Sequence, residues 1–405
     1  MSKRYLHLFD FGTTQISGVC IDLSQPKSEP LGYAKIVSHG VKKGSVHNFE
    51  HVGTALNQLV TTLHEQSSLQ LKSAVVACGA EHVKAVNSYG VVAIRHKEVT
   101  EHDVDAVMSV AEAVPLPPEY QILHVLPQEF YVDGKAGIDD PVGMMGVRLE
   151  VKAHIIMIPK SMEVALNQVF TKLGVRQLQL VYTPLVLPQS VLTNDEREIG
   201  TCVVDIGAGL TKLTVVKNHQ IINTAIVPLG GDLVTSDVSV AEKLPIHLAE
   251  DIKKNEGCID FERTFGDEKI VIPSTEGTHE RAVSRRFLAE VITARYAEII
   301  KVVAQMCAKY PQLLNGGVVL SGGGSHVHGL VPWAQDQLGI SVRLSEMIDL
   351  RNDLLYEILA DENFTLLGLI HYVSNRTSIL EQGRNTSGGV HRVWKQLKRW
   401  VEVNF

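Results

Sequence analysis

The chain has 405 residues, of which 45% are hydrophobic and 20% are charged, a composition that excludes an intrinsically disordered protein. The formal net charge of −7 argues against a body that binds nucleic acid. The five cysteines are widely spaced, which indicates buried thiols, and no apolar run approaches the roughly 20 residues of a membrane-spanning helix.

One pattern of strand, turn and strand occurs twice in the chain. The first copy is Tyr5–Asp22 (YLHLFDFGTTQISGVCID) and the second is Thr201–Val216 (TCVVDIGAGLTKLTVV). Each copy consists of an apolar strand, an Asp-x-Gly turn with small residues, and a second apolar strand. Duplicated hairpins this far apart predict two related α/β halves that face a common cleft.

The predicted secondary structure of the segment between the hairpins changes at about Glu81. Before it, helical spacing predicts a helix over Val52–Leu63, and an apolar run predicts a buried strand over Ser73–Gly79. After it, short strands surround a helix near Glu101–Val114, which indicates a small α+β insertion over residues 82–161. The predicted strands are Gly90–Ile94, Gln121–Pro127 and Met145–Pro159. A helix over Ser161–Leu173 and a strand over Gln177–Pro184 follow the insertion.

The segment after the second hairpin is mainly helical. Its spacing of apolar residues predicts helices over Asp232–Lys243, His247–Asn255 and Glu280–Lys309. The last of these is long and amphipathic. A strand over Val318–Leu320 then leads into a glycine run and a further helix.

The two hairpin turns are candidate phosphate-binding sites. Glycine lets the backbone approach a phosphate closely, and the turns offer N–H groups to its oxygens. The aspartate of each turn can hold a magnesium ion through water molecules. The candidate residues are Asp10, Gly12, Thr13 and Thr14 in the first turn, and Asp205, Gly207 and Gly209 in the second.

Two further glycine turns and one charged pair complete the candidate nucleotide site. Gly230 and Gly231 open a helix, a favourable place for an anionic group. Gly322, Gly323 and Gly324 follow a strand, where a base or ribose could lie on the backbone. Glu250 and Lys253 are one helical turn apart and could hold ribose hydroxyls.

The end of the chain is polar and then amphipathic. Residues 376–389 end in Ser-Gly-Gly and predict a flexible linker, and residues 390–405 (VHRVWKQLKRWVEVNF) predict a helix. Aromatic rings and basic side chains together are typical of a helix that lies on an anionic membrane. The alternative is a helix that packs on the body or binds a partner. The candidate membrane-binding residues are Val393, Trp394, Leu397, Lys398, Arg399, Trp400, Val401 and Phe405.

These pieces, in this order, resemble the actin/Hsp70 ATPase superfamily and, within it, the FtsA family of bacterial division proteins. The resemblance spans essentially the whole chain. It is clearest at Leu192–Gly209, Gly230–Ser239, Leu288–Ile300, Gly316–Leu330 and the basic tail.

The resemblance implies an α/β, actin-like fold, in which ribonuclease H-like duplicated domains flank a nucleotide cleft. It also implies an inserted α+β subdomain and a C-terminal amphipathic helix. The implied boundaries are 1–81 and 162–198 for the first half, 82–161 for the insertion, 199–228 for the first part of the second half, 229–309 for its outer subdomain, 310–375 for its second part and the return to the first half, 376–389 for the linker and 390–405 for the helix.

The function implied by the resemblance is that of a membrane tether for the division ring. Such proteins bind ATP with Mg²⁺, assemble into filaments, hold the C-terminal tail of FtsZ and recruit later division proteins. They act as peripheral proteins at the cytoplasmic face of the bacterial inner membrane, at the septum. A basic helix face could take the FtsZ tail, and the alternative is a merely solvated face. Its residues are Arg285, Arg286, Arg295 and Lys301.

The chain departs from its relatives in the phosphate site. Gln15 and Ser17 stand where relatives often have a lysine after the first aspartate, and Leu210 and Lys212 replace the usual Thr and Asp of the second turn. The Tyr182–Pro184 stretch lacks the carboxylate or amide that would orient an attacking water. No catalytic residue is therefore predicted, and we expect a nucleotide-dependent switch with weak or absent hydrolysis.

Lys212 offers a substitute for the missing lysine. Our hypothesis is that its ammonium reaches the terminal phosphates, and the alternative is that it points to solvent. Two other functions stay open: an active ATPase or sugar kinase of the same superfamily, and a pilus-assembly actin homologue. The latter proteins lack a basic, tryptophan-containing tail.

Overall fold

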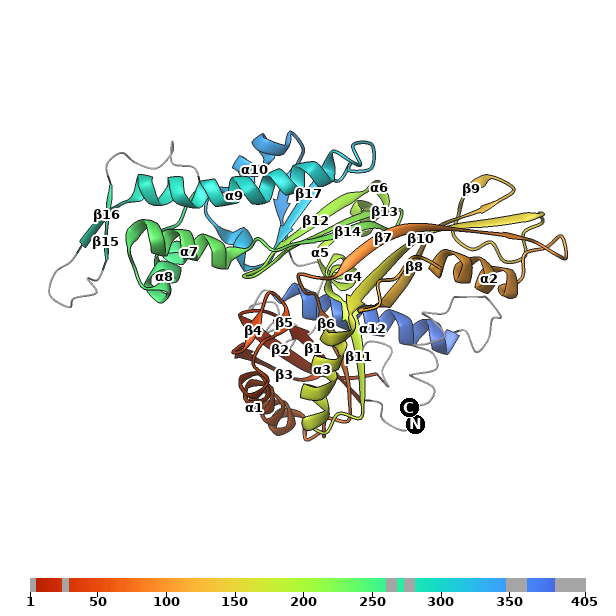
Figure 1. Ribbon diagram of the computed structural model, residues 1–405, viewed down its shortest axis with the longest axis horizontal. Helices are drawn as coiled ribbons and strands as arrows, with labels where there is room; N and C mark the ends of the chain where they lie inside the picture. Colours follow the sequence, from red (N-terminus) through yellow and green to blue (C-terminus); the bar gives the residue numbers. More distant parts are fainter. Residues whose placement is uncertain (1–4, 24–28, 260–267, 273–280, 347–362, 383–405) are drawn as a thin grey trace. The chain divides into compact units, whose positions relative to one another are not determined.

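The computed structural model describes residues 5–23, 29–259, 268–272, 281–346 and 363–382 (Figure 1). The chain divides into two compact units. Unit 1 comprises Met1–Ser190, His219–Ala225 and Ile348–Phe405, and unit 2 comprises Val191–Asn218 and Ile226–Met347.

A five-stranded sheet in the order β11-β6-β1-β2-β3 forms the centre of unit 1. The antiparallel pair β1–β2 is the first predicted hairpin, whereas β6 runs parallel to both β1 and β11. Most side chains of β1 and β2 are buried, which explains why both strands are mainly apolar and do not alternate with polar residues. The strands are β1 (Tyr5–Phe11), β2 (Gln15–Asp22), β3 (Glu29–Val37), β6 (Ser73–Cys78) and β11 (Gln177–Tyr182).

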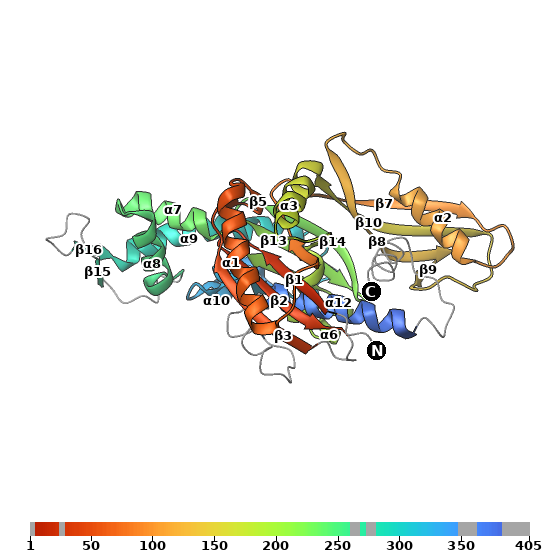
Figure 2. The same cartoon turned by 90° about the horizontal axis from the view of Figure 1, so that it is seen from below.

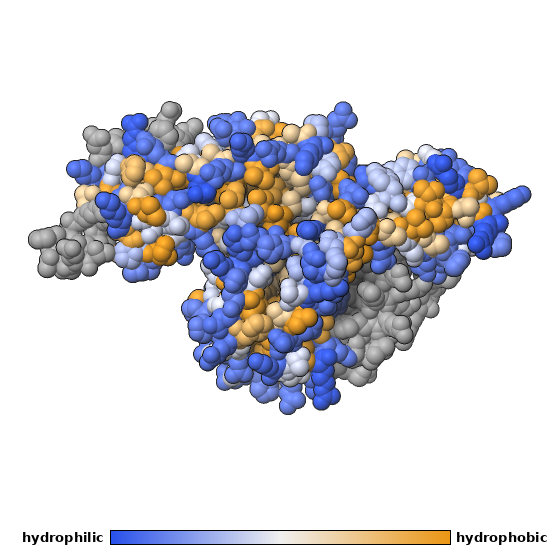
Figure 3. Space-filling model, viewed as in Figure 1, coloured by the Kyte–Doolittle hydropathy of each residue, from blue (hydrophilic) through white to orange (hydrophobic). Residues whose placement is uncertain are grey.

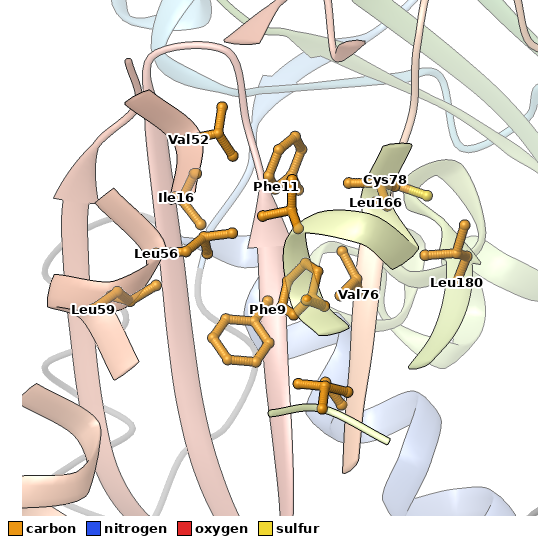
Figure 4. Close-up of a cluster of buried hydrophobic side chains, with 14 of the residues drawn as sticks. Phe9, Phe11, Ile16, Val52, Leu56, Leu59, Val76, Cys78, Leu166 and Leu180 are labelled. Atoms are coloured by element: carbon orange, nitrogen blue, oxygen red, sulfur yellow. The ribbon is translucent and has the colours of Figure 1, made fainter. Parts of the chain in front are cut away.

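Helices of unit 1 pack on this sheet around one hydrophobic core. Figure 4 shows Phe9 and Phe11 of β1 between aliphatic side chains of α1 (Phe49–Ser67) and Leu166 of α3 (Lys160–Lys172). Helix α1 begins three residues before its predicted start, because the Asn48 side chain accepts hydrogen bonds from the first-turn N–H groups. The remaining elements are β4 (Val41–Lys42), β5 (Ser45–Val46), α4 (Thr183–Val186), α5 (Pro188–Val191) and α12 (Phe364–Gln382). The predicted linker start at residue 376 is wrong, because α12 continues to Gln382.

The inserted segment has a sheet and a core of its own. The sheet order is β7-β10-β8-β9, and α2 (Glu101–Glu112) lies along it (Figure 2). Thr100 and Asp103 form a capping box at the start of α2: each side chain accepts a hydrogen bond from the backbone N–H of the other residue. The strands are β7 (Lys84–Ala93), β8 (Tyr120–Val132), β9 (Lys135–Ile138) and β10 (Arg148–Pro159). Their buried side chains form a cluster separate from the first core.

The second five-stranded sheet has the order β14-β13-β12-β17-β18. The antiparallel pair β12–β13 is the second predicted hairpin, and β17 runs parallel to β12 and β18. The sheet therefore repeats the strand order and directions of unit 1, with β12 in the place of β1 and β17 in the place of β6. Its strands are β12 (Thr201–Ile206), β13 (Thr211–Lys217), β14 (Gln220–Val227), β17 (Val318–Ser321) and β18 (Val342–Leu344).

The helices of unit 2 follow the predicted order. Helix α7 contacts both α8 and α9, and Figure 1 shows α9 as the longest of the three. The elements are α6 (Asn194–Ile199), α7 (Gly231–Glu242), α8 (Ile246–Glu256), α9 (Arg285–Cys307), the 3-10 turn η1 (Gly323–His326) and α10 (Leu330–Leu338).

The predicted start of α9 at Glu280 is wrong. The Arg281–Ser284 segment is instead strand β16, which pairs with β15 (Lys269–Ile272). Ser284 ends this strand and caps α9, because its side chain accepts a hydrogen bond from the Phe287 N–H.

The five cysteines are buried and free, as the sequence predicted. Hydrophilic residues cover much of the visible surface, and apolar residues reach it in patches between them (Figure 3). Within the described ranges, none of the helices combines the length and the apolar character that crossing a bilayer requires.

Candidate nucleotide site

The start of α7 is fastened to the turn of the second hairpin. The N–H of Gly231 donates to the Gly207 carbonyl at 2.9 Å, and the N–H of Asp232 donates to the Ala208 carbonyl at 2.8 Å. A Cβ on Gly230 would lie 2.4 Å from the Ala208 carbonyl oxygen, so only glycine fits there. Two of the predicted glycine turns therefore form one continuous backbone surface.

The third glycine turn joins them at the end of β12. Gly322 has a φ of +83°, and a Cβ on it would lie 2.4 Å from Oδ1 of Asp205. The Tyr296 hydroxyl of α9 donates to the Gly324 carbonyl at 2.5 Å and so connects α9 to the Gly322–Gly324 run. Unit 2 thus brings Gly207, Gly230 and Gly322 together, although they are far apart in the chain.

Lys253 ties α8 to the first turn of α7. Its ammonium donates to the Gly231 carbonyl at 3.2 Å, to the Thr235 hydroxyl at 2.7 Å and to the Glu250 carboxylate at 2.5 Å. The predicted ribose pair, Glu250 and Lys253, is therefore assembled beside the glycine turns. The Thr235 hydroxyl also donates to Glu250.

The charges around Lys253 are balanced within this cluster. Burial by itself would raise the pKa of Glu250, but hydrogen bonds from Lys253 and Thr235 outweigh it and lower that pKa. At Asp232, burial dominates and raises the pKa, with Lys253 acting in the opposite direction. Glu250 is thus held as a carboxylate at neutral pH.

Asp205 and Lys212 form an ion pair across the second hairpin. Their Cα atoms are register partners, and Lys212 Nζ lies 2.9 Å from Asp205 Oδ2. Only 18% of the lysine side chain and 11% of the aspartate side chain are exposed. Lys212 therefore does not point to solvent, contrary to the alternative interpretation of the sequence. Its contact with phosphate stays a prediction.

This ion pair bears on the predicted magnesium ion. A divalent cation prefers carboxylates that carry uncompensated charge, whereas Lys212 neutralises Asp205. The donor set at Asp205 therefore does not fit a divalent cation. Asp10, half-buried at the end of β1, has no lysine as its cross-strand partner and stays a predicted magnesium site.

The first hairpin turn in unit 1 has the same construction. The Gly12 N–H donates to the Gln15 carbonyl at 3.1 Å, and the Thr13 hydroxyl accepts a hydrogen bond from the Gly44 N–H at 3.3 Å. Thr14 accepts one through its carbonyl from the Ser38 N–H. Asp10 is the register partner of Ser17, just as Asp205 is of Lys212.

Sequence reasoning missed several side chains that complete the two turns. Thr235 lies one helical turn after Gly231. This spacing could have predicted that the Thr235 side chain lies near the glycine turn. Tyr296 and Asn363 gave no such signal, because each contacts a residue distant in the chain. The buried Asn363 side chain donates to the Ser17 hydroxyl.

The predicted basic face of α9 is largely paired with acidic residues. Arg285 contacts Glu256 and Glu268, and Arg286 contacts Glu290 at 3.2 Å. Arg295 contacts Asp237 and Glu298, whereas Lys301 is exposed. Binding of the FtsZ tail there stays a prediction. The predicted membrane helix, residues 390–405, lies outside the described residues.

Two family models match the chain. The one described as "SHS2 domain inserted in FTSA" matches residues 80–157, and the one described as "Cell division protein FtsA" matches residues 202–362. The first of these covers nearly the same residues as the α+β insertion that the sequence predicted.

Full-length relatives share about a third of the sequence. Cell division protein FtsA of Pseudomonas aeruginosa is 31% identical over 406 aligned positions, which cover 98% of this chain and 97% of the relative. Cell division protein FtsA of Escherichia coli K12 is 32% identical over 388 positions, which cover 93% and 92%.

Solved structures with low sequence identity share the fold. A chain of the PilM–PilN type IV pilus biogenesis complex has a TM-score of 0.64 and 18% identity, and covers 91% of this chain and 98% of its own. MreB5 of Spiroplasma citri bound to ADP has a TM-score of 0.58 and 12% identity, with 93% and 98% covered. The predicted actin-like fold with an inserted α+β subdomain is confirmed, apart from the tail helix.

Proposed function

The chain belongs to the FtsA family of cell division proteins, and we propose on that premise that it tethers the FtsZ ring to the membrane. Its general role is in cell division and its fold is actin-like. The proposal adds four finer functions: ATP binding, filament assembly, attachment to the inner membrane, and capture of FtsZ and later division proteins.

The observation that carries the proposal is that the glycine turns at Gly230 and Gly322 both pack against the Asp205–Gly209 turn in unit 2, which also carries the Asp205–Lys212 ion pair. Backbone N–H groups at a hairpin turn of this kind suit the phosphates of ATP. The first N–H groups of α7 already donate to the Gly207 and Ala208 carbonyls, so α7 positions this turn. Lys212 would supply a cation to the terminal phosphates. Glu250, held in place by Lys253, would accept hydrogen bonds from the ribose hydroxyls. For unit 1, phosphate binding by the Gly12–Thr14 turn and magnesium binding by Asp10 are proposed from the same turn construction.

Hydrolysis is proposed to be weak or absent. An efficient ATPase needs a side chain that orients the attacking water, and the family places it near the strand that ends at Tyr182. Here Tyr182 and Thr183 are 1% and 2% exposed, and neither carries a carboxylate. ATP would therefore act as a ligand that favours assembly, as in a switch.

Attachment to the membrane is proposed to run through the tail, residues 390–405. Its tryptophans and basic residues suit anionic lipid, although a single helix of this kind binds only marginally. Assembly into filaments would align many tails on one surface and multiply their combined affinity. The insertion and the surface around Arg285 and Arg286 would then take protein partners.

A genetic exchange of the tail tests this function. After depletion of the chain in its source bacterium, the full chain should restore septation and a chain ending at residue 389 should not. Replacement of residues 390–405 by an unrelated amphipathic membrane helix should restore it again, because only lipid attachment is required. Full rescue by the shortened chain would contradict the tether. Failure of the replacement helix alone would instead favour a tail that binds a specific partner.

A further inference from the structure

The Lys212 ammonium occupies the position beside the Asp205 carboxylate that a bound cation would otherwise take. Lys212 stands directly opposite Asp205 in the β12–β13 register, and its Nζ is 2.9 Å from Oδ2. The other carboxylate oxygen, Oδ1, faces the glycine run, since it lies 2.4 Å from the position of a Cβ on Gly322. The carboxylate is therefore held between the Lys212 ammonium and the backbone at Gly322.

A lysine in this position changes the charge that the site offers to a ligand. A carboxylate alone recruits a divalent cation, which in turn compensates the triphosphate. The Asp205–Lys212 pair is neutral, and the ammonium repels a second cation nearby. At the same time, the ammonium donates to Asp205 Oδ2 through one N–H, and ammonium N–H donors suit phosphate oxygens.

The first hairpin provides an internal comparison. The position equivalent to Lys212 is Ser17, which is buried, uncharged and hydrogen-bonded to Asn363. Of the two hairpins, only the second therefore carries a cation opposite its aspartate. The difference between them is one of charge, since their strand directions and register are the same.

We propose that the Lys212 ammonium takes the place of the divalent cation at Asp205, so that the chain binds a nucleoside triphosphate with little dependence on Mg²⁺. This inference rests on the proposed ATP site. It adds that the site accepts ATP without bound Mg²⁺.

Calorimetric titration of the full chain with ATP, in Mg²⁺ and in EDTA, tests the inference. The two dissociation constants should agree within about threefold. In Lys212→Met, which keeps the length of the side chain and removes its charge, affinity in EDTA should fall at least about tenfold. Affinity of this variant should recover partly in Mg²⁺, because Asp205 regains an uncompensated charge.

Lys212→Asp extends the test, because two facing carboxylates should make ATP binding strongly dependent on Mg²⁺. Lys217→Met is the matched control on the same strand: the Lys217 ammonium contacts the Ile199 carbonyl, at the opposite end of β13. This variant should bind as the wild type does in both buffers. Thermal melting of each variant checks that it is folded.

The possible results separate the inference from the proposed function. Binding of ATP by the wild type only in Mg²⁺ would overturn the inference and leave ATP binding intact. Unchanged affinity of folded Lys212→Met in EDTA would also overturn it. Absence of binding in both buffers would overturn the proposed ATP site, and the inference with it.

Discussion

Arg295 of α9 donates two parallel hydrogen bonds to Asp237 of α7. Its Nε donates to Oδ2 at 2.7 Å and its Nη2 donates to Oδ1 at 3.1 Å. The sequence placed Arg295 on a partner-binding face, but this bidentate pair joins two helices of the same unit. Arg295 therefore has a structural role in unit 2, and its part in binding a partner stays a prediction.

Arg295→Ala should lower the stability of unit 2 by about 1 kcal/mol, since the pair is partly exposed and solvent screens it. Chemical denaturation measures the change. Lys301→Ala, an exposed change on the same helix, is the control and should have little effect. A double-mutant cycle with Asp237→Ala isolates the pair, and additive effects would show that it contributes nothing.

The surface around Arg285 and Arg286 should bind the FtsZ tail. The double change Arg285→Glu, Arg286→Glu should weaken binding of a tail peptide about tenfold or more, because it reverses two charges facing an acidic ligand. Fluorescence anisotropy with a labelled peptide gives the affinity. The variant must first show a normal melting curve, since both arginines have acidic neighbours.

Lys309→Glu is the control for that experiment, because it reverses one charge at an exposed site beyond the other end of α9. It should change the affinity by no more than about twofold, through long-range electrostatics alone. Equal effects of the double variant and the control would remove Arg285 and Arg286 from the binding surface.

Gly322 should be intolerant of a side chain. Gly322→Ala should cost about 1–3 kcal/mol, because the residue has a positive φ and its Cβ would press on Asp205 and the Ile206 carbonyl. Gly323→Ala is the matched control, since a Cβ there meets nothing within 4 Å. Thermal melting compares the two, and equal melting temperatures would contradict this account of the glycine run.

The stability of the chain should fall in acid through two buried histidines. Burial lowers the pKa of His154 and of His7 to about 4, against 6.5 when unfolded. The unfolded state therefore binds more protons between pH 6.5 and 4, and stability is lost as pH falls through that window. Each histidine contributes at most about 3 kcal/mol of this loss.

His154→Gln should flatten the pH dependence, although it also disturbs the contacts of His154 with Thr224 and Asn87. The informative readout is therefore the slope of unfolding free energy between pH 6.5 and 4, not its value at pH 7. His51→Gln, at an exposed position, should leave the slope unchanged. An unchanged slope in His154→Gln would show that this histidine titrates normally.

Periodicity and turn chemistry predicted the elements that position the candidate site. The hairpins at Asp10 and Asp205, the insertion and the helices after Gly230 follow from local patterns of apolar and glycine residues. The β15–β16 pair was missed, because strand β16 carries arginine and runs directly into an amphipathic helix. Its identity as a strand depends on pairing with a segment elsewhere in the chain.

Side-chain contacts within the site could be predicted only in part. Hairpin register places Lys212 opposite Asp205, but sequence reasoning weighed only a phosphate contact against a solvent-exposed lysine and missed the ion pair. The hydrogen bond from Tyr296 to Gly324 and the contact of Asn363 with Ser17 depend on how distant segments pack. Such contacts leave no periodic signal in the sequence.

Flotation of FtsZ filaments with anionic liposomes tests the central proposal most directly. FtsZ, ATP and the full chain are mixed with liposomes and centrifuged through a density gradient. The account predicts that FtsZ rises with the liposomes only when the full chain is present, and stays at the bottom with a chain ending at residue 389. FtsZ that remains at the bottom in the presence of the membrane-bound full chain would contradict the account.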